Sequence, residues 1–175
     1  FQYVTGSLKD VTFEVFALED VKSADGEGED YYKKDELVAT ITTDDTGIAK
    51  VSGLPLGKYY VKEKATVEGF VLDDEAREID LTYRDQDTAE VTYSADWQNN
   101  RQKAEVEVVK KEKDSDCVLE GAVFALCAKN DITGADGNVI LEADTVIEEL
   151  ATDKEGKLTF TADLPIGFEY YIKET

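Results

Sequence analysis

Two stretches of the sequence are nearly alike: residues 54–63 read LPLGKYYVKE, and residues 164–174 read LPIGFEYYIKE. The tyrosine, valine and isoleucine residues in each stretch are typical of a β-strand, in which alternate side chains share one face. Glu63 and Glu174 therefore share a face with the apolar residues that precede them. A carboxylate is costly to bury unless it is paired or reacts. Its recurrence at the same place in both copies indicates a chemical role.

The repeat extends over most of the chain. Residues 8–63 and 119–174 follow one template, in which a constant offset relates Leu8 to Leu119 and Phe13 to Phe124, and also relates the two Ala-Asp-Gly runs. The period is far longer than the roughly 20 to 50 residues of a solenoid repeat. The repeat therefore predicts two tandem domains, residues 1–101 and residues 102–175.

Short segments rich in β-branched and aromatic residues recur between turn-forming residues, and this pattern predicts an all-β fold. Clean alternation of apolar and polar residues favours antiparallel sheets packed on one face, so we expect two small β-sandwiches in series. Residues 20–36 are predicted to form a long loop, and residues 131–149 leave room for a short helix. The expected strands are residues 11–17, 37–43, 48–51, 59–63, 77–83, 89–95, 106–110, 122–128, 157–161 and 170–174.

The composition narrows the classes of function. With 19 basic and 40 acidic side chains the net charge is −21, which disfavours binding to nucleic acid. No apolar run is long enough to predict membrane insertion of this segment. The acidic loop at residues 25–30 suggests calcium, but its spacing does not fit the twelve-residue calcium loop. We expect no metal and no cofactor.

The cysteine and histidine content also disfavours a disulfide and a metal site. Cys117 and Cys127 flank one predicted strand, and an extended link of that length would hold them apart, so two free or buried thiols are expected. A disulfide would require the chain to bend back between them. The chain contains no histidine, and therefore lacks the commonest general base and metal ligand.

Two further polar residues fall on apolar strand faces. The alternation of Val91, Tyr93 and Trp97 brings Asn99 onto the same face, and the strand that begins at Val106 ends with Lys110 on its apolar face. Taken singly, each residue fits an ordinary strand end, since lysine can extend its ammonium group to water. Together with the repeated glutamate, they suggest a set of reactive groups.

These motifs resemble the SpaA-like, Cna protein B-type repeat of Gram-positive surface adhesins and pilins, which has a prealbumin-like, immunoglobulin-like fold. The pattern comprises V-x-V-x-K at residues 106–110, L-x-G-A-x-F-x-L at 119–126, T-D at 152–153 and L-P-x-G ending in glutamate at 164–174. The first copy departs mildly, because residues 8–13 lack the Gly-Ala pair. The resemblance covers nearly the whole chain.

The resemblance implies an amide bond that forms spontaneously between a lysine and an asparagine on the terminal strands of a domain, promoted by a buried glutamate. Glu63 and Glu174 would be the promoting residues, and Asn99 and Lys110 would be bond-forming residues. Burial would favour a neutral amine as nucleophile and a protonated glutamate that polarises the amide. Such a bond cannot be reduced and would hold the strands together under force.

Each predicted domain contains only part of this set. The first contains Glu63 and Asn99, whereas its lysine would precede Phe1. The second contains Lys110 and Glu174, whereas its asparagine would follow Thr175. We therefore expect the first domain to lack its first strand and the second its last, either because the chain is an excerpt of a longer array or because it accepts a strand from elsewhere.

The resemblance implies a non-enzymatic stalk or pilin-like module, secreted and placed at the bacterial cell surface or cell wall, with neighbouring repeat domains as partners. An adhesive module would instead bind a host glycan or matrix protein through residues 20–36 and 131–149. A glycosidase would need Glu63 and Glu174 in one open cleft. Their placement in separate domains argues against that reading.

Overall fold

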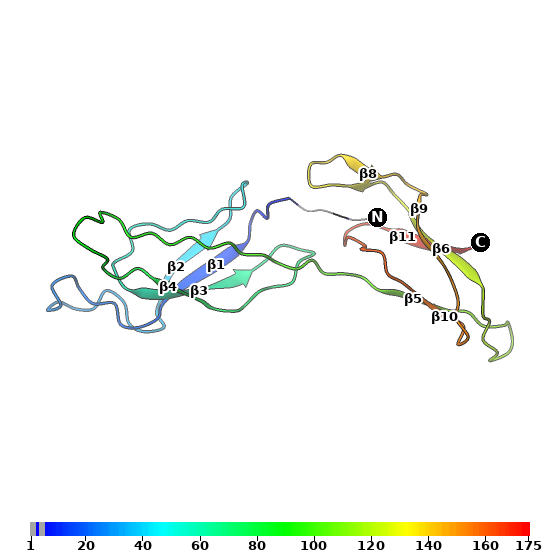
Figure 1. The fold of residues 1–175 in the computed structure, drawn as a ribbon, viewed down its shortest axis with the longest axis horizontal. Coiled ribbons are helices and arrows are strands. Elements are labelled where there is room, and N and C mark those ends of the chain that lie inside the picture. Colours follow the sequence, from blue (N-terminus) through cyan, green and yellow to red (C-terminus); the bar gives the residue numbers. More distant parts are fainter. Residues whose placement is uncertain (1–2, 4–5) are drawn as a thin grey trace. The chain divides into compact units, whose positions relative to one another are not determined.

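A computed structural model describes Tyr3 and residues 6–175 of the chain (Figure 1). These residues form two compact units. The first unit comprises residues 7–100, and the second comprises residues 101–175 together with Tyr3 and Gly6. The regular secondary structure in the described part of the chain is entirely β, as the sequence predicts. None of the described residues lies in a helix with the length and apolar character needed to cross a bilayer.

The first unit contains a four-stranded antiparallel sheet in the order β2-β1-β3-β4. Alternate residues of the central strand β1 (Phe13, Val15 and Ala17) are buried, and they pack with Tyr59 and Val61 of β3 to form the core. This is the period-2 burial expected of a strand with one packed face. The strands are β1 (Thr12–Ala17), β2 (Leu37–Thr42), β3 (Lys58–Ala65) and β4 (Arg77–Asp80).

The second unit repeats this arrangement. Its central strand β6 lies between β11 and β9, as β1 lies between β3 and β2, and β5 pairs with β10 in a separate sheet. The register repeats as well, because Phe13 lies opposite Glu63 and Phe124 lies opposite Glu174. The strands are β5 (Val106–Val109), β6 (Val123–Ala128), β7 (Ile132–Thr133), β8 (Val139–Leu141), β9 (Val146–Ala151), β10 (Lys157–Phe160) and β11 (Tyr170–Glu174).

The structure differs from the sequence predictions in three segments. Residues 131–149 contain the β7-β8 hairpin and the start of β9 in place of a short helix. Residues 48–51 and 89–95 form no strand, although their residue types favour one. A strand requires a neighbouring strand to which it can hydrogen-bond. In the second unit, the counterpart of residues 48–51 is β10, and it pairs with β5. Alternation alone therefore overstates the strand content of the first unit.

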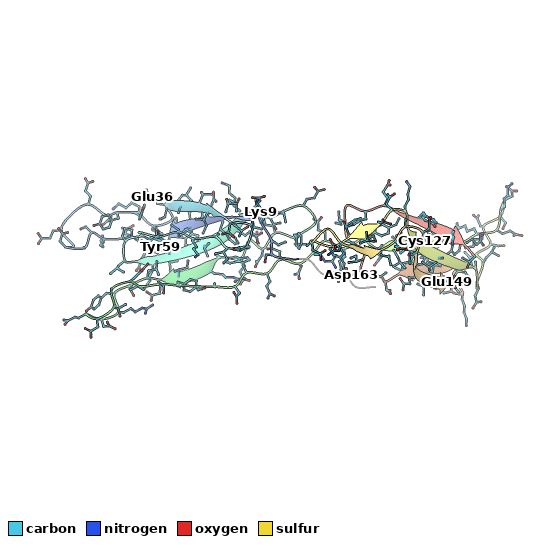
Figure 2. All side chains as sticks on the ribbon, turned by 90° about the horizontal axis from the view of Figure 1, so that it is seen from above. Lys9, Glu36, Tyr59, Cys127, Glu149 and Asp163 are labelled. Atoms are coloured by element: carbon cyan, nitrogen blue, oxygen red, sulfur yellow. The ribbon has the colours of Figure 1, made fainter. Side chains whose placement is uncertain are left out.

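One tyrosine in each unit closes the turn that precedes its own strand, β3 in the first unit and β11 in the second. The Tyr59 hydroxyl donates to the Pro55 carbonyl at 2.5 Å, and the Tyr170 hydroxyl donates to the Pro165 carbonyl at 2.8 Å. Tyr59 is completely buried among the strands of the first unit (Figure 2). Burial, the largest cause, raises the pKa of both hydroxyls to about 12.

We expect these two tyrosines to make the fold sensitive to alkali. An unfolded tyrosine ionises with a pKa of about 10, so the unfolded chain loses these protons first as the pH rises. The stability that the neutral hydroxyls contribute should be complete below about pH 10 and lost as the pH approaches about 12. The free energy of unfolding, measured by denaturant titration at several pH values in this range, tests the expectation. The double variant Tyr59→Phe, Tyr170→Phe should show a shallower decline; an identical slope in both proteins would contradict the assignment.

Candidate functional site

Strand β3 carries Glu63 into the core of the first unit. The side chains of Tyr59, Val61 and Glu63 alternate along the strand and all point to the packed face. Glu63 is only 3% exposed, as the sequence predicts for an acid on an apolar face. In the strand register it lies opposite Phe13 of β1, which is also buried.

Asn99 is the partner of the buried carboxylate. Its Nδ2 atom donates to Oε1 of Glu63 at 2.9 Å and to Oε2 at 2.7 Å, and it also lies 3.1 Å from the carbonyl oxygen of Val71. The backbone N–H of Asp73 donates to Oε2 at 3.3 Å. Hydrogen bonds of this kind offset the cost of burying a carboxylate. The structure thus joins two of the residues that the sequence selects.

Two residues that the sequence analysis did not assign to the site hold the Asn99 segment in place. The ring of Trp97 meets Phe13 edge-on at 5.1 Å, and the guanidinium of Arg77 lies 3.7 Å from the centre of the Trp97 ring. Arg77 also donates to the Asp96 carbonyl at 2.5 Å and to Asp73 at 3.3 Å. This cation–π contact anchors a segment that has no ladder of strand hydrogen bonds. The single tryptophan of the chain was the signal available in the sequence.

In the second unit, Lys110 follows directly after β5 and pairs with Glu174 of β11. Lys110 Nζ lies 2.7 Å from Glu174 Oε2 and 5.9 Å from the centre of the Phe124 ring. The lysine side chain is 29% exposed and that of Glu174 is 49% exposed. The prediction that Glu174 faces the core is therefore wrong for this structure, because it lies at the open end of β11.

Gly156 fixes the backbone of Lys110. The Lys110 N–H donates to the Gly156 carbonyl at 2.8 Å, and the Lys110 carbonyl accepts from the N–H of Leu119 at 3.1 Å. Gly156 has a φ of +71°, and a Cβ atom built on it would lie 2.7 Å from the Lys110 carbonyl oxygen. Only glycine fits both the positive φ and this close approach. Gly47 occupies the same turn in the first unit, with a φ of +77°.

The two units thus contain complementary parts of one arrangement. A carboxylate lies opposite a phenylalanine in both; it contacts an asparagine in the first unit and a lysine in the second. Asn99 and Lys110 belong to different units, so the described residues do not bring all three residue types together within either one.

The acidic loop of the first unit is engaged with its own neighbours. A hydrogen bond from Ser23, followed by those from the Glu27 and Gly28 N–H groups, lowers the pKa of Asp25. Asp30 pairs with Lys22 and Lys33, which also lower its pKa. Throughout the described ranges, no group of three or more acidic or cysteine side chains is arranged to hold a metal ion.

The free thiols behave as the sequence predicts. Cys117 is exposed, Cys127 is buried in β6, and both are free. Neither contributes to the two carboxylate pairs.

Comparison with known protein families matches residues 3–97 and 104–175 to the SpaA prealbumin-like fold domain. The chain belongs to the SpaA prealbumin-like fold domain family. The prediction made from the sequence motifs is thereby confirmed, and the two matched ranges correspond to the two copies of the repeat. The all-β tandem arrangement described above is that of two SpaA domains in series.

Several solved structures are similar to this chain. The Bacillus anthracis TIE protein is 28% identical with a TM-score of 0.63, and the match covers 97% of this chain and 25% of that protein. This chain thus spans a quarter of its length. The shaft pilin spaA of Lactobacillus rhamnosus GG is 20% identical with a TM-score of 0.35, covering 96% of this chain and 77% of that one. The minor pilin GBS52 of Streptococcus agalactiae is 19% identical with a TM-score of 0.34, covering 97% and 71% respectively. Comparison with curated proteins finds no match.

Proposed function

We propose that this pair of SpaA domains is a structural, non-enzymatic module of a bacterial cell-surface protein, which holds other parts of that protein away from the cell wall. The proposed modules are residues 1–101 and 102–175, and their partners are neighbouring domains of the same protein. The observation that supports the proposal most strongly is the contact of Glu63 with Asn99, together with the equivalent contact of Glu174 with Lys110. Family membership supports the structural role.

The proposed chemistry is an amide bond within each complete domain. The neutral lysine Nζ attacks the asparagine Cγ, the Cγ–Nδ2 bond breaks, and ammonia leaves while the glutamate carries protons between the two nitrogens. Asn99 Nδ2 lies within 2.9 Å of both carboxylate oxygens, which is the contact that such a proton transfer requires. Holding the groups together in a dry interior takes the place of an enzyme.

We infer that the two half-sets show the two sides of one complete site. The first unit shows the carboxylate against the amide, and the second shows the carboxylate against the amine. Since Phe13 and Phe124 occupy the same register position opposite their glutamates, the two half-sets lie at equivalent positions of the repeat. In a complete domain, one glutamate would contact both reacting nitrogens.

The test is the intact mass of a longer form of the chain that carries the neighbouring sequence on both sides. We expect the mass to be lower than the theoretical value by one ammonia for each of the two domains. Glu63→Ala should abolish the loss in the first domain alone, and Glu174→Ala should abolish it in the second alone. Glu78→Ala, which removes a carboxylate from the exposed face of β4, is the matched control. The full theoretical mass in the unsubstituted protein would reject the bond.

A further inference from the structure

The second unit holds Tyr3 by four contacts. Nη2 of Arg101 donates to the Tyr3 carbonyl at 3.3 Å, and the guanidinium carbon lies 4.8 Å from the centre of the Tyr3 ring. The Tyr3 hydroxyl donates to the Thr133 carbonyl at 3.3 Å, and Phe168 meets the Tyr3 ring edge-on at 6.3 Å. The backbone, ring face, ring edge and hydroxyl of one residue are therefore all bound.

Asp163 fixes the arginine that faces Tyr3. The Arg101 guanidinium pairs with the Asp163 carboxylate, and the two side chains are only 14% and 24% exposed. Asp163 lies in the turn between β10 and β11 (Figure 2). Nη1 of Arg101 and Oδ1 of Asp163 are buried and find no hydrogen-bond partner among the described residues. A guanidinium shielded from water and held in one plane is well suited to an aromatic face.

The residues that contact Tyr3 in the second unit are not all repeated in the first. When the LPLGKYY stretch is aligned with LPIGFEYY, Asp163 falls on Gly53, and the second copy is one residue longer at Phe168-Glu169. The first unit therefore has neither the carboxylate nor the extra aromatic residue at these positions. Two of the differences between the copies thus lie at residues that contact Tyr3 or its arginine, which indicates a specialised site in the second unit.

We propose that Arg101, Asp163, Phe168 and the Thr133 carbonyl form an intramolecular clamp whose ligand is Tyr3. Tyr3 and Arg101 lie 98 positions apart in the sequence and are in direct contact. The clamp therefore closes residues 7–100 into a loop whose two ends are both held by the second unit. Tension applied to the chain at Tyr3 reaches the second unit through the clamp, and residues 7–100 bear that load only after the clamp opens. This proposal is independent of amide-bond formation.

The clamp is tested by amide hydrogen exchange, measured by mass spectrometry on the whole chain. Tyr3→Ala removes the ring contacts and the hydroxyl contact, and should accelerate exchange of the amides around Arg101 and Phe168 by about tenfold. Tyr3→Phe keeps the ring over the guanidinium and should have a smaller effect. Asp163→Gly, which introduces the residue found in the first copy, should also accelerate exchange of the amides around Arg101.

Tyr83→Ala is the matched control, because Tyr83 lies in the first unit and is 64% exposed. It should leave exchange around Arg101 unchanged. If Asp163→Gly also accelerates exchange in the buried strand β6, that substitution destabilises the second unit as a whole. The result for Tyr3→Ala then decides whether the clamp exists. Unchanged exchange in Tyr3→Ala, or an effect no larger than that of Tyr83→Ala, would overturn the clamp.

Discussion

Glu63→Ala is expected to destabilise the first unit by about 2 to 3 kcal/mol, because it leaves the Asn99 amide and the Asp73 N–H without their acceptor. Glu63 is almost fully buried, so water replaces these bonds poorly. The measurement is the free energy of unfolding from denaturant titration, followed by the fluorescence of Trp97, which packs beside the site against Phe13.

The control for this prediction comes from the repeat itself. Glu174→Ala removes the corresponding carboxylate of the second unit, but its pair with Lys110 is partly exposed, and such pairs contribute about 1 kcal/mol or less. The two substitutions are chemically identical and should differ clearly in cost. Equal costs would mean that the burial of Glu63 does not determine its contribution.

Leu126→Ala in β6 is expected to destabilise the second unit by about 2 to 5 kcal/mol. Leu126 is 1% exposed and packs with Leu158 and Leu164, so its removal leaves a cavity in a strand whose neighbouring residues are also buried. The measurement is denaturant unfolding monitored by far-ultraviolet circular dichroism.

Ile172 is the matched control for Leu126, since the two residues are register partners on adjacent strands. Ile172 is 38% exposed, so Ile172→Ala removes less buried surface and should cost clearly less. A cost for Leu126→Ala as small as that for Ile172→Ala would contradict the assignment of Leu126 to the core.

The sequence predicted the parts of the fold that depend on local pattern. The strands around Phe13, Phe124 and Glu63 were found because their side chains alternate and because each occurs in a repeated context. Burial of Glu63 followed from its position in that alternation. Glu174 occupies the same position, yet it is half exposed, because burial depends on what covers the strand and not on the strand alone.

Other features could not be predicted from the sequence. The hairpin within residues 131–149 was missed because its two strands are only two and three residues long, too short to show a period. The position of Arg77 over Trp97 depends on how two segments pass each other. Nothing in the local pattern around Tyr3 indicates that it contacts Arg101. These contacts arise from tertiary packing, which the periodicity of a single segment does not encode.

The glycine turns make the two ends of each domain unequal in their tolerance of change. A Cβ atom built on Gly47 would lie 2.9 Å from Cβ of Ser7, and one built on Gly156 would lie 2.7 Å from the Lys110 carbonyl oxygen, so a side chain would collide at either position. At Gly26, in the long loop of residues 20–36, and at Gly137, in the β7-β8 turn, a Cβ atom would meet nothing within 4 Å, although the positive φ of both residues still favours glycine. We therefore expect inserted peptide to be tolerated better in the loop of residues 20–36 and in the β7-β8 turn, where a longer loop costs little free energy, than at Gly47 or Gly156. A domain of this kind can acquire new surface features at one end while the packing at its other end stays the same.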